Sequence, residues 1–361
     1  MTDVAWSEFT VEQALETQAS SCEQVGSRLY GVLLTGLLAD HRAGGITATL
    51  LDGVSERPVH DAIPLRYLAA GHRLALSGRA PRLAPHYPSC GGEWDGTDRV
   101  VGDFLATVVD SEAEFRAGMR RNVQTNEVGR AAVLASGFSL IVGRHGSAID
   151  QLEIGSSAGL LSRWDHFFYD TGESSVGDPL SDVRFGPEWW IGERRPTLLP
   201  VEVRRRRASD ISPIDVSTTE GRVTMLSFVW PDQVDRIERL RQALKVAGEV
   251  PIAVDRADAG EWLADRLLEE DGTGDAGGTA RVVFHSIVWQ YLPRSTKDRI
   301  REVFAAAGAA ATDTSPLLWL RMEPESRDYA ELRLTTWPGA AEETLAQVGY
   351  HGAGVRWLTN D

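Results

Sequence analysis

The sequence predicts an α/β protein in which a helical N-terminal domain precedes a mostly parallel sheet with helices on both faces and an antiparallel C-terminal edge. Apolar residues recur at helical intervals from Val11 to about Gly146. From Gln151 onward, short apolar segments alternate with helical ones, and right-handed crossovers then place helices on both faces of a parallel sheet. Two strand-like segments, 331–336 and 355–358, predict the antiparallel edge.

The helical domain is expected to span residues 1–147. Its first helix follows Thr10-x-x-Gln13, a capping-box spacing in which side chains satisfy the free N–H groups at a helix start. A leucine-rich segment at 29–38 has the next helical period. Three more helices are predicted at 64–76, 100–121 and 125–142.

The sheet domain is expected to span residues 148–361. Its strands are predicted at 151–154, 201–206, 251–254, 281–284 and 317–320. Helices are predicted from Leu160 and at 231–247, 261–268 and 296–307. Residues 170–197 are interpreted as an insertion that forms a hairpin or a lid, and they include Trp189 and Trp190.

Composition excludes several classes of function. The 361 residues carry a net charge of −15, which repels nucleic acid and anionic membranes. The run Arg204–Arg207 lies on a strand that sends two side chains to each face, so local ion pairs are its expected role. Two cysteines match no metal-binding spacing, and no metal site is predicted. An acidic start and the lack of an apolar run of about 18 residues predict a cytoplasmic protein.

The segment from Glu153 to Gly159 is the most informative motif. A strand ends there in the small residues Gly155-Ser156-Ser157-Ala158-Gly159, which let a ligand approach backbone N–H groups. Asp210 ends the next strand, where a carboxylate accepts ribose hydroxyls. The alternative readings are a tight turn for the small residues and a helix cap for Asp210.

Polar residues also follow the other predicted strands. Asp258-Ala259 follows the third and is similar to an acidic-plus-small element beside an adenine ring, with a helix N-cap as the alternative. Further candidates for catalysis or substrate binding follow the fourth and fifth strands or lie in the helical domain: His285, Gln290, Tyr291, Arg321, Glu323, Asn126 and Glu127. Core packing, helix capping and an internal Arg–Glu ion pair are their structural alternatives.

The strings LYGVLLTGLLAD, YPSCGG, VQTNEVGR, LEIGSSAGL, LSFVWPDQ, VVFHSIVWQYLP, WLRMEP and GYHGAGVRWL resemble a bacterial family, domain-of-unknown-function family 2332, over nearly the full chain. The second half also resembles class I S-adenosylmethionine-dependent methyltransferases. That resemblance implies a Rossmann-like fold with Glu153, Gly155, Ser157 and Gly159 around the methionine part, Asp210 on the ribose, and Asp258 and Ala259 at the adenine.

The expected function is methyl transfer from S-adenosylmethionine to a small molecule. His285, Glu127 and Glu323 are the candidate bases, and Gln290, Tyr291, Arg321 and Asn126 the candidate substrate ligands. We expect the helical domain to cover a substrate held near His285.

Two other functions stay open at this point. The turn also fits the Gly-x-Ser-x-Gly motif of serine hydrolases, with Ser157 as nucleophile and with Asp313 and His351 in the required chain order. The third possibility is a protein that binds S-adenosylmethionine or another nucleotide without catalysis.

Overall fold

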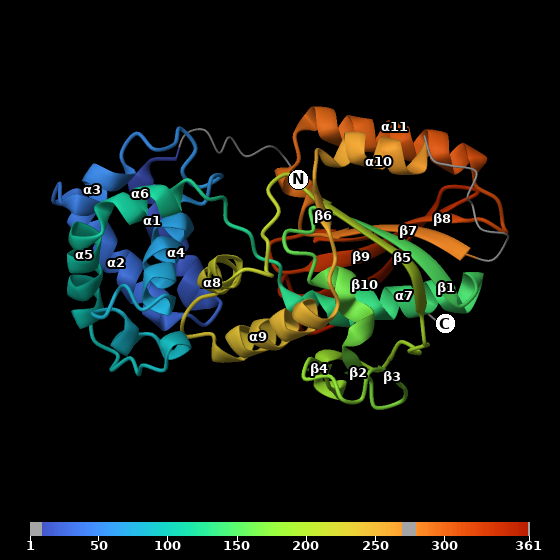
Figure 1. Ribbon diagram of the computed structural model, residues 1–361, viewed down its shortest axis with the longest axis horizontal. Coiled ribbons are helices and arrows are strands. Elements are labelled where there is room, and N and C mark those ends of the chain that lie inside the picture. The colour runs from blue at the N-terminus through green and yellow to red at the C-terminus, as the bar shows by residue number, and fades with distance from the viewer. Residues whose placement is uncertain (1–8, 269–278, 360–361) are drawn as a thin grey trace. The chain divides into compact units, whose positions relative to one another are not determined.

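The computed structural model describes residues 9–268 and 279–359, and the chain forms two compact units (Figure 1). The helical unit contains residues up to 125 together with 218–238, and the sheet unit contains 126–217 and the residues from 239 on. Among the described residues, no helix is long and apolar enough to cross a lipid bilayer.

The helical unit confirms the predicted helical N-terminal region. Thr10 and Gln13 form the predicted capping box at the start of its first helix. Leu33, Leu37 and Tyr67 are among the side chains that fill its core. Its helices are α1 (Val11–Gln24), α2 (Arg28–Arg42), α3 (Ile46–Leu51), α4 (Ile63–Leu76), α5 (Arg99–Asp110), α6 (Glu112–Met119) and α8 (Thr219–Ser227), with short 3₁₀ helices η2 (Ala84–His86) and η3 (Pro88–Cys90).

The two units differ from the predicted division at residue 147. Helix α7 (Ala131–His145) follows the 3₁₀ helix η4 (Val128–Arg130) and belongs to the sheet unit, because it packs on the sheet. Residues 131–142 are all buried, as expected of a helix that is covered on all sides. Conversely, α8 joins the helical unit, where it contacts α4.

The sheet unit is built on an eight-stranded, mixed sheet with the order β11-β10-β9-β8-β7-β1-β5-β6. The central strands from β8 to β6 are parallel, while β9, β10 and β11 are joined by antiparallel pairs and confirm the predicted antiparallel edge. Its strands are β1 (Ala148–Ile154), β5 (Glu202–Asp210), β6 (Val254–Arg256), β7 (Thr279–Ser286), β8 (Leu317–Pro324), β9 (Ala330–Trp337), β10 (Ala341–Val348) and β11 (Arg356–Trp357).

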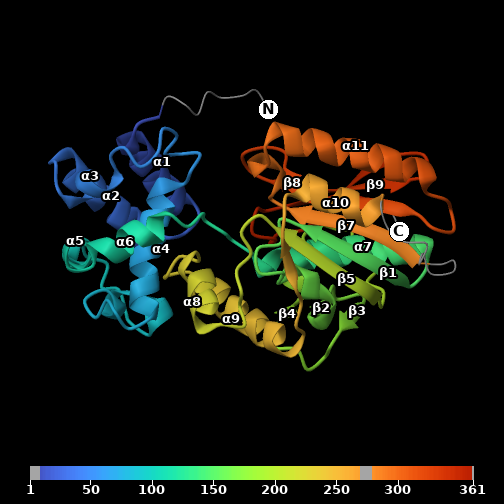
Figure 2. The same cartoon turned by 45° about the horizontal axis from the view of Figure 1, so that its top comes forward.

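Helices cover both faces of this sheet (Figure 1, Figure 2). On one face, α10 (Ala259–Leu267) and α11 (Arg294–Ala310) bury a core with alternate residues of β1 and β7, such as Leu152 and Val283. On the other face lies α7, whose residues contact β7 to β10. The remaining helices after β1 are η5 (Leu161–His166), η6 (Pro187–Trp189), α9 (Val234–Glu249) and η7 (Trp289–Tyr291).

Two local expectations need correction. The helix predicted from Leu160 is the short 3₁₀ helix η5, because the chain turns directly into β2 (Phe168–Asp170). Strand β10 was not predicted, since its residues lack a clear alternation of apolar and polar side chains. Within the predicted insertion at 170–197, β2 pairs with β3 (Ser175–Gly177) as a hairpin, and β4 (Arg184–Phe185) completes a three-stranded sheet.

The close approach of α11 to the sheet gives a stability prediction. A Cβ atom added at Gly308 would lie 2.3 Å from Cδ1 of Trp337, whereas one at Gly248 in α9 meets nothing within 4 Å. Gly308→Ala should therefore lower the free energy of unfolding by about 1–3 kcal/mol through overpacking. The matched control Gly248→Ala should leave it unchanged or raise it by up to about 1 kcal/mol. Urea unfolding measures both, and an unaffected Gly308→Ala variant would contradict this packing.

Candidate functional site

The carboxyl edge of the parallel strands contains the point where the strand order reverses. From β1 the chain proceeds to β5 and β6 on one side, while β7 and β8 lie on the other. In open α/β sheets, ligands bind in the crevice outside the strand ends at such a reversal. The loops that leave β1, β5, β7 and β8 at this edge therefore form the candidate site.

The loop after β1 is the predicted turn of small residues. Ser157 has a left-handed backbone with φ of +55°, and its N–H donates to Oδ2 of Asp210 over 2.8 Å. The other oxygen of Asp210 accepts the N–H of Ser212 over 2.7 Å. Asp210 therefore ties the turn after β1 to the loop after β5. At Gly155, where φ is +64°, a Cβ would lie 2.5 Å from Val288, so the close approach of this neighbour requires glycine.

Arg163 fixes the far side of the same turn. Its guanidinium donates to the carbonyl oxygens of Ala158, over 3.2 Å, and of Gly159, over 2.7 Å. A further hydrogen bond reaches the carbonyl of Val250. Burial lowers the pKa of Arg163 to about 10, so the group still carries its charge at neutral pH. This arginine has a role that was not foreseen, because nothing in the local sequence shows that it folds back on the turn.

Glu153 lies on the opposite face of β1 from the core beneath α10 and α11. It is only 2% exposed and accepts a hydrogen bond from the hydroxyl of Ser162 in η5. Burial raises the pKa of its carboxyl to about 8, although the nearby Arg163 lowers it. Glu153 is therefore mostly uncharged at neutral pH.

Asp258 is the N-cap of α10. This role is the alternative that the sequence offers to a position beside an adenine ring. Its Oδ1 accepts the N–H of Gly260 over 2.8 Å, and its Oδ2 accepts the hydroxyl of Thr296 over 2.6 Å. The carboxylate thus joins α10 to α11. Ala259 is buried in the core on this side of the sheet.

His285 and Glu323 form a buried pair at the ends of β7 and β8. Oε1 of Glu323 is 2.7 Å from Nδ1 of His285 and also accepts the N–H groups of Val288 and Trp289, over 2.9 and 3.2 Å. Among the described residues, neither Oε2 of Glu323 nor Nε2 of His285 has a partner, although both atoms are buried. Between the pair and these amides, Ile287 has a φ of +53°, which is strained for a β-branched residue.

The segment 126–130 crosses the same edge and links three of its loops. Oδ1 of Asn126 accepts the N–H of Leu160 after β1, over 2.8 Å. Arg130 donates to the carbonyl of Ser286 at the end of β7, over 3.1 Å, and to that of Tyr350 after β10, over 3.0 Å. We call residues 126–130 the edge strap. Arg130 was not among the predicted site residues, although it belongs to the polar string VQTNEVGR.

Glu127 caps η4 within the edge strap, because its carboxylate accepts the N–H of Gly129 over 3.1 Å. Gln290 and Tyr291 follow β7 and are exposed. Desolvation raises the pKa of the Tyr291 phenol, and the charge of Arg130 partly offsets this rise.

Arg321 points elsewhere. It forms an ion pair with Glu342 of β10 and donates to the hydroxyl of Thr335 on β9 over 2.8 Å. Its guanidinium also lies 4.3 Å from the ring centre of Trp319. The predicted internal Arg–Glu pair exists, but its partner is Glu342 and not Glu323. The substrate role predicted for Arg321 has no support in these contacts.

The residues of the alternative serine triad lie at different edges. Ser157 follows β1 at the carboxyl edge, as does His351 after β10, which runs parallel to β8. Asp313 precedes β8 and so lies at the amino edge, about 20 Å away along strands that rise about 3.3 Å per residue. Among the described residues, no group of three or more metal-ligating side chains is present either.

The raised pKa of Glu153 predicts how stability depends on pH. The folded state holds this proton up to about pH 8, whereas the ordinary value is 4.5. Unfolding therefore releases a proton between these values, and the stability contributed at low pH is lost as pH rises through the folded pKa. Relative to Glu153→Gln, the wild type should lose up to about 1.4 kcal/mol per pH unit between about pH 5 and 8. Urea unfolding at pH 5, 6.5 and 8 tests this, and parallel pH profiles would refute it.

Sequence comparison then places the chain among known proteins. A family model described as an uncharacterized protein conserved in bacteria (DUF2332) matches residues 12–357. No curated protein and no solved structure matches the chain. This family model covers both the helical unit and the sheet unit, which confirms the resemblance to this family that the sequence showed. The chain therefore belongs to the DUF2332 family.

Proposed function

We propose that this protein is an S-adenosylmethionine-dependent methyltransferase that acts on a small molecule. The observation that carries the proposal is the strand order. When the first six strands of the large sheet are numbered along the chain, from β1 to β9, they lie side by side in the order 3-2-1-4-5-6. This is the strand order of Rossmann sheets, and here the sixth strand is antiparallel to the fifth. The reversal lies beside the turn of small residues 155–159, where such sheets bind a nucleoside cofactor. The resemblance of the second half of the sequence to class I methyltransferases supports S-adenosylmethionine as that cofactor.

The residues of the turn and of β5 fit the cofactor. Backbone groups at Gly155, Ser157 and Gly159 would surround its methionine part, because their small side chains leave room. Asp210 would hold the ribose, because its carboxylate lies at the end of β5 and accepts the N–H of Ser157 in the turn after β1. The side chain of Asp258 is engaged by Gly260 and Thr296, so the start of α10 would meet the adenine through backbone atoms.

The bound cofactor would supply a methyl group already activated by its sulfonium. The chain's own residues would then align the acceptor and take its proton. Glu323 is the best base, because three donors fix Oε1 while Oε2 has no partner among the described residues. His285 is completely buried, so it acts as a positioning residue that orients Glu323. Glu127 and Asn126 hold the edge strap, and Tyr291 and Gln290 are placed to meet the acceptor.

One observation favours a serine hydrolase as the second candidate. The left-handed backbone of Ser157 is the strained turn that a nucleophile elbow requires. Against it, Asp313 lies at the opposite edge, so a triad would need a different acid. A binding protein without catalysis remains the third candidate, and it shares the first experiment below with the methyltransferase.

The first prediction concerns binding. Calorimetric titration should give saturable binding of S-adenosylmethionine and S-adenosylhomocysteine, and Asp210→Asn should weaken both by about tenfold or more, because the ribose hydroxyls lose an anionic acceptor. Asn has nearly the same shape and keeps an acceptor for one of the two backbone N–H groups that Asp210 binds. The control is Asp298→Asn on the exposed side of α11, which should bind as the wild type does.

Each outcome of this titration is decisive. Binding that is lost in Asp210→Asn but kept in Asp298→Asn supports the cofactor site. Absence of binding in the wild type overturns the methyltransferase, and activity against a chromogenic ester that disappears in Ser157→Ala would then support the hydrolase.

The second prediction concerns the base. With the small-molecule fraction of a bacterial extract as acceptor source, Glu323→Gln should lower formation of S-adenosylhomocysteine by about 100-fold or more. Its affinity for S-adenosylhomocysteine should stay unchanged, because Gln keeps the acceptor for the three donors. Glu331→Gln, the register neighbour on β9, is the matched control and should turn over normally. Full activity of Glu323→Gln would exclude Glu323 as the base.

A further inference from the structure

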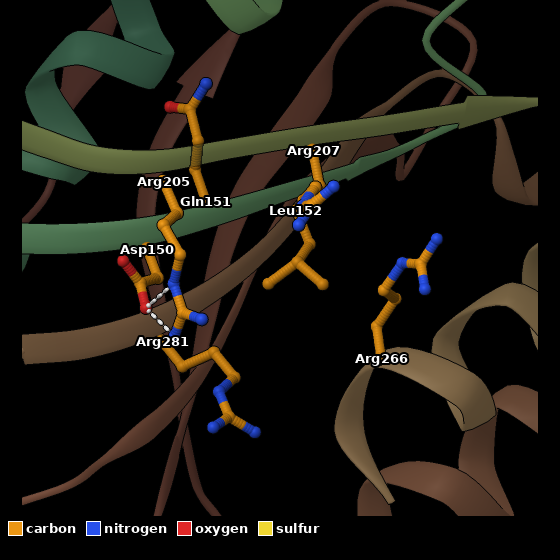
Figure 3. A pocket seen from close by; sticks show the side chains of 7 residues that line it. All are labelled: Asp150, Gln151, Leu152, Arg205, Arg207, Arg266 and Arg281. Atoms are coloured by element: carbon orange, nitrogen blue, oxygen red, sulfur yellow. Dashed lines mark hydrogen bonds and ion pairs between the residues drawn. The ribbon is translucent and has the colours of Figure 1, made fainter. Parts of the chain in front are cut away.

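A second polar site lies at the other end of the same sheet (Figure 3). It is a pocket beside the middle of β1 and β5, the first half of β7 and the last turn of α10. Its wall is formed by Asp150, Gln151, Leu152, Arg205, Arg207, Arg266 and Arg281. Asp150 pairs with Arg205 and Arg281, and Leu152 with Arg207, across the neighbouring strands, so the sheet register gathers these arginines.

The pocket carries an excess of positive charge. Four guanidinium groups line it against the single carboxylate of Asp150, which accepts two N–H groups from Arg205, one of them over 2.8 Å. Asp255 contacts Arg266 over 3.3 Å. Arg207 and Arg281 make no ion pair or side-chain hydrogen bond with any other residue that the structure describes.

Two features make this cluster unusual for a surface ion-pair network. The chain as a whole has a net charge of −15, yet these arginines gather without an equal number of acids. In addition, Nε of Arg266 is buried and has no hydrogen-bond partner among the described residues. A buried donor without a partner costs free energy unless a ligand or water satisfies it.

The run Arg204–Arg207 was expected to form local ion pairs, and part of it does. Arg205 binds Asp150, and Arg206 binds Asp165 on the other face of the sheet over 2.8 Å. Arg207 departs from that expectation, because it lines the pocket without an acidic partner among the described residues. The alternation along β5 thus sends Arg205, which pairs with Asp150, and Arg207 to the same face.

We propose that this pocket binds a small molecule that carries a phosphate or pyrophosphate group. Planar guanidinium groups match the oxygens of a phosphate in bidentate hydrogen bonds and stay charged at every physiological pH. The charge of the whole chain repels nucleic acid, which favours a small ligand over a nucleic acid.

This site is separate from the proposed cofactor site. The pocket residues nearest to it, Leu152 and Arg207, lie three residues before Gly155 and Asp210, which corresponds to about 10 Å along an extended strand. S-adenosylmethionine carries no phosphate, so it is not the expected occupant. The inference therefore does not depend on the proposed methyltransferase function.

Calorimetric titration with inorganic phosphate and with pyrophosphate, at constant ionic strength, tests the proposal. We expect saturable binding to the wild type and a loss of affinity of about tenfold in Arg207→Gln and in Arg281→Gln. These two arginines have no partner in the described fold, so their removal should not unfold the protein. Arg294→Gln, at an exposed position on α11, is the control and should bind as the wild type does.

The outcomes separate the possible occupants. Tighter binding of pyrophosphate than of phosphate, lost in both pocket variants, supports a site for a diphosphate group. If both anions bind weakly and the variants make no difference, the proposal is overturned. Binding of S-adenosylmethionine should be equal in all these variants, which keeps the two proposals distinguishable.

Discussion

The loops that leave the carboxyl edge of the sheet need acceptors for their backbone N–H groups, and polar side chains that are buried or half-buried supply several of them. An unpaired buried amide costs free energy comparable to a lost hydrogen bond, so the loops can adopt their paths only where such acceptors exist. Five side chains act as such acceptors, and each accepts at least one backbone N–H group from its own loop or from a neighbouring one. They are Asp210, Asp258, Glu323, Asn126 and Glu127.

The same accounting separates structural residues from those with capacity left for a ligand. Asp258 is engaged at both oxygens by groups that hold α10 and α11 together. In Glu323, Oε1 accepts all three hydrogen bonds. Its Oε2 is buried and has no partner among the described residues. Asp210 binds backbone N–H groups of two different loops, at Ser157 and Ser212, and so joins the turn after β1 to the loop after β5. Sequence alone ranks the three residues equally, whereas their hydrogen bonds distinguish them.

Patterns that repeat over short distances were readable from the sequence. The helical period and the Thr10 capping box placed the N-terminal helices, and the alternation of apolar segments placed the parallel strands. Features that depend on distant partners were not readable. The boundary of the units falls before α7 because α7 packs on a sheet formed later in the chain, and α8 returns to helices formed much earlier. Strand β10 is held by its pairing with β9 and not by its own composition.

The candidate site divides in the same way. A strand followed by small residues marks the carboxyl edge, because parallel strands all end there, so most predicted residues do lie at that edge. The arginine pocket could not be foreseen, since it depends on the register that sets Arg207 beside Leu152 and Arg281 beside Asp150.

Strands β1 and β5 contribute to both the carboxyl-edge site and the arginine pocket. After a register shift between Ile149 and Asp150, they pair in parallel from Asp150 to Ile154, and this pairing joins the two ends of the sheet. Side chains farther apart than about 10 Å, with no shared partner, usually act additively, so substitutions in the pocket leave the carboxyl edge as an independent site. Coupling between the sites would require a ligand to bind two arrangements of these strands with different affinity. Because β1 and β5 are paired at the centre of the sheet, we expect the two sites to act independently.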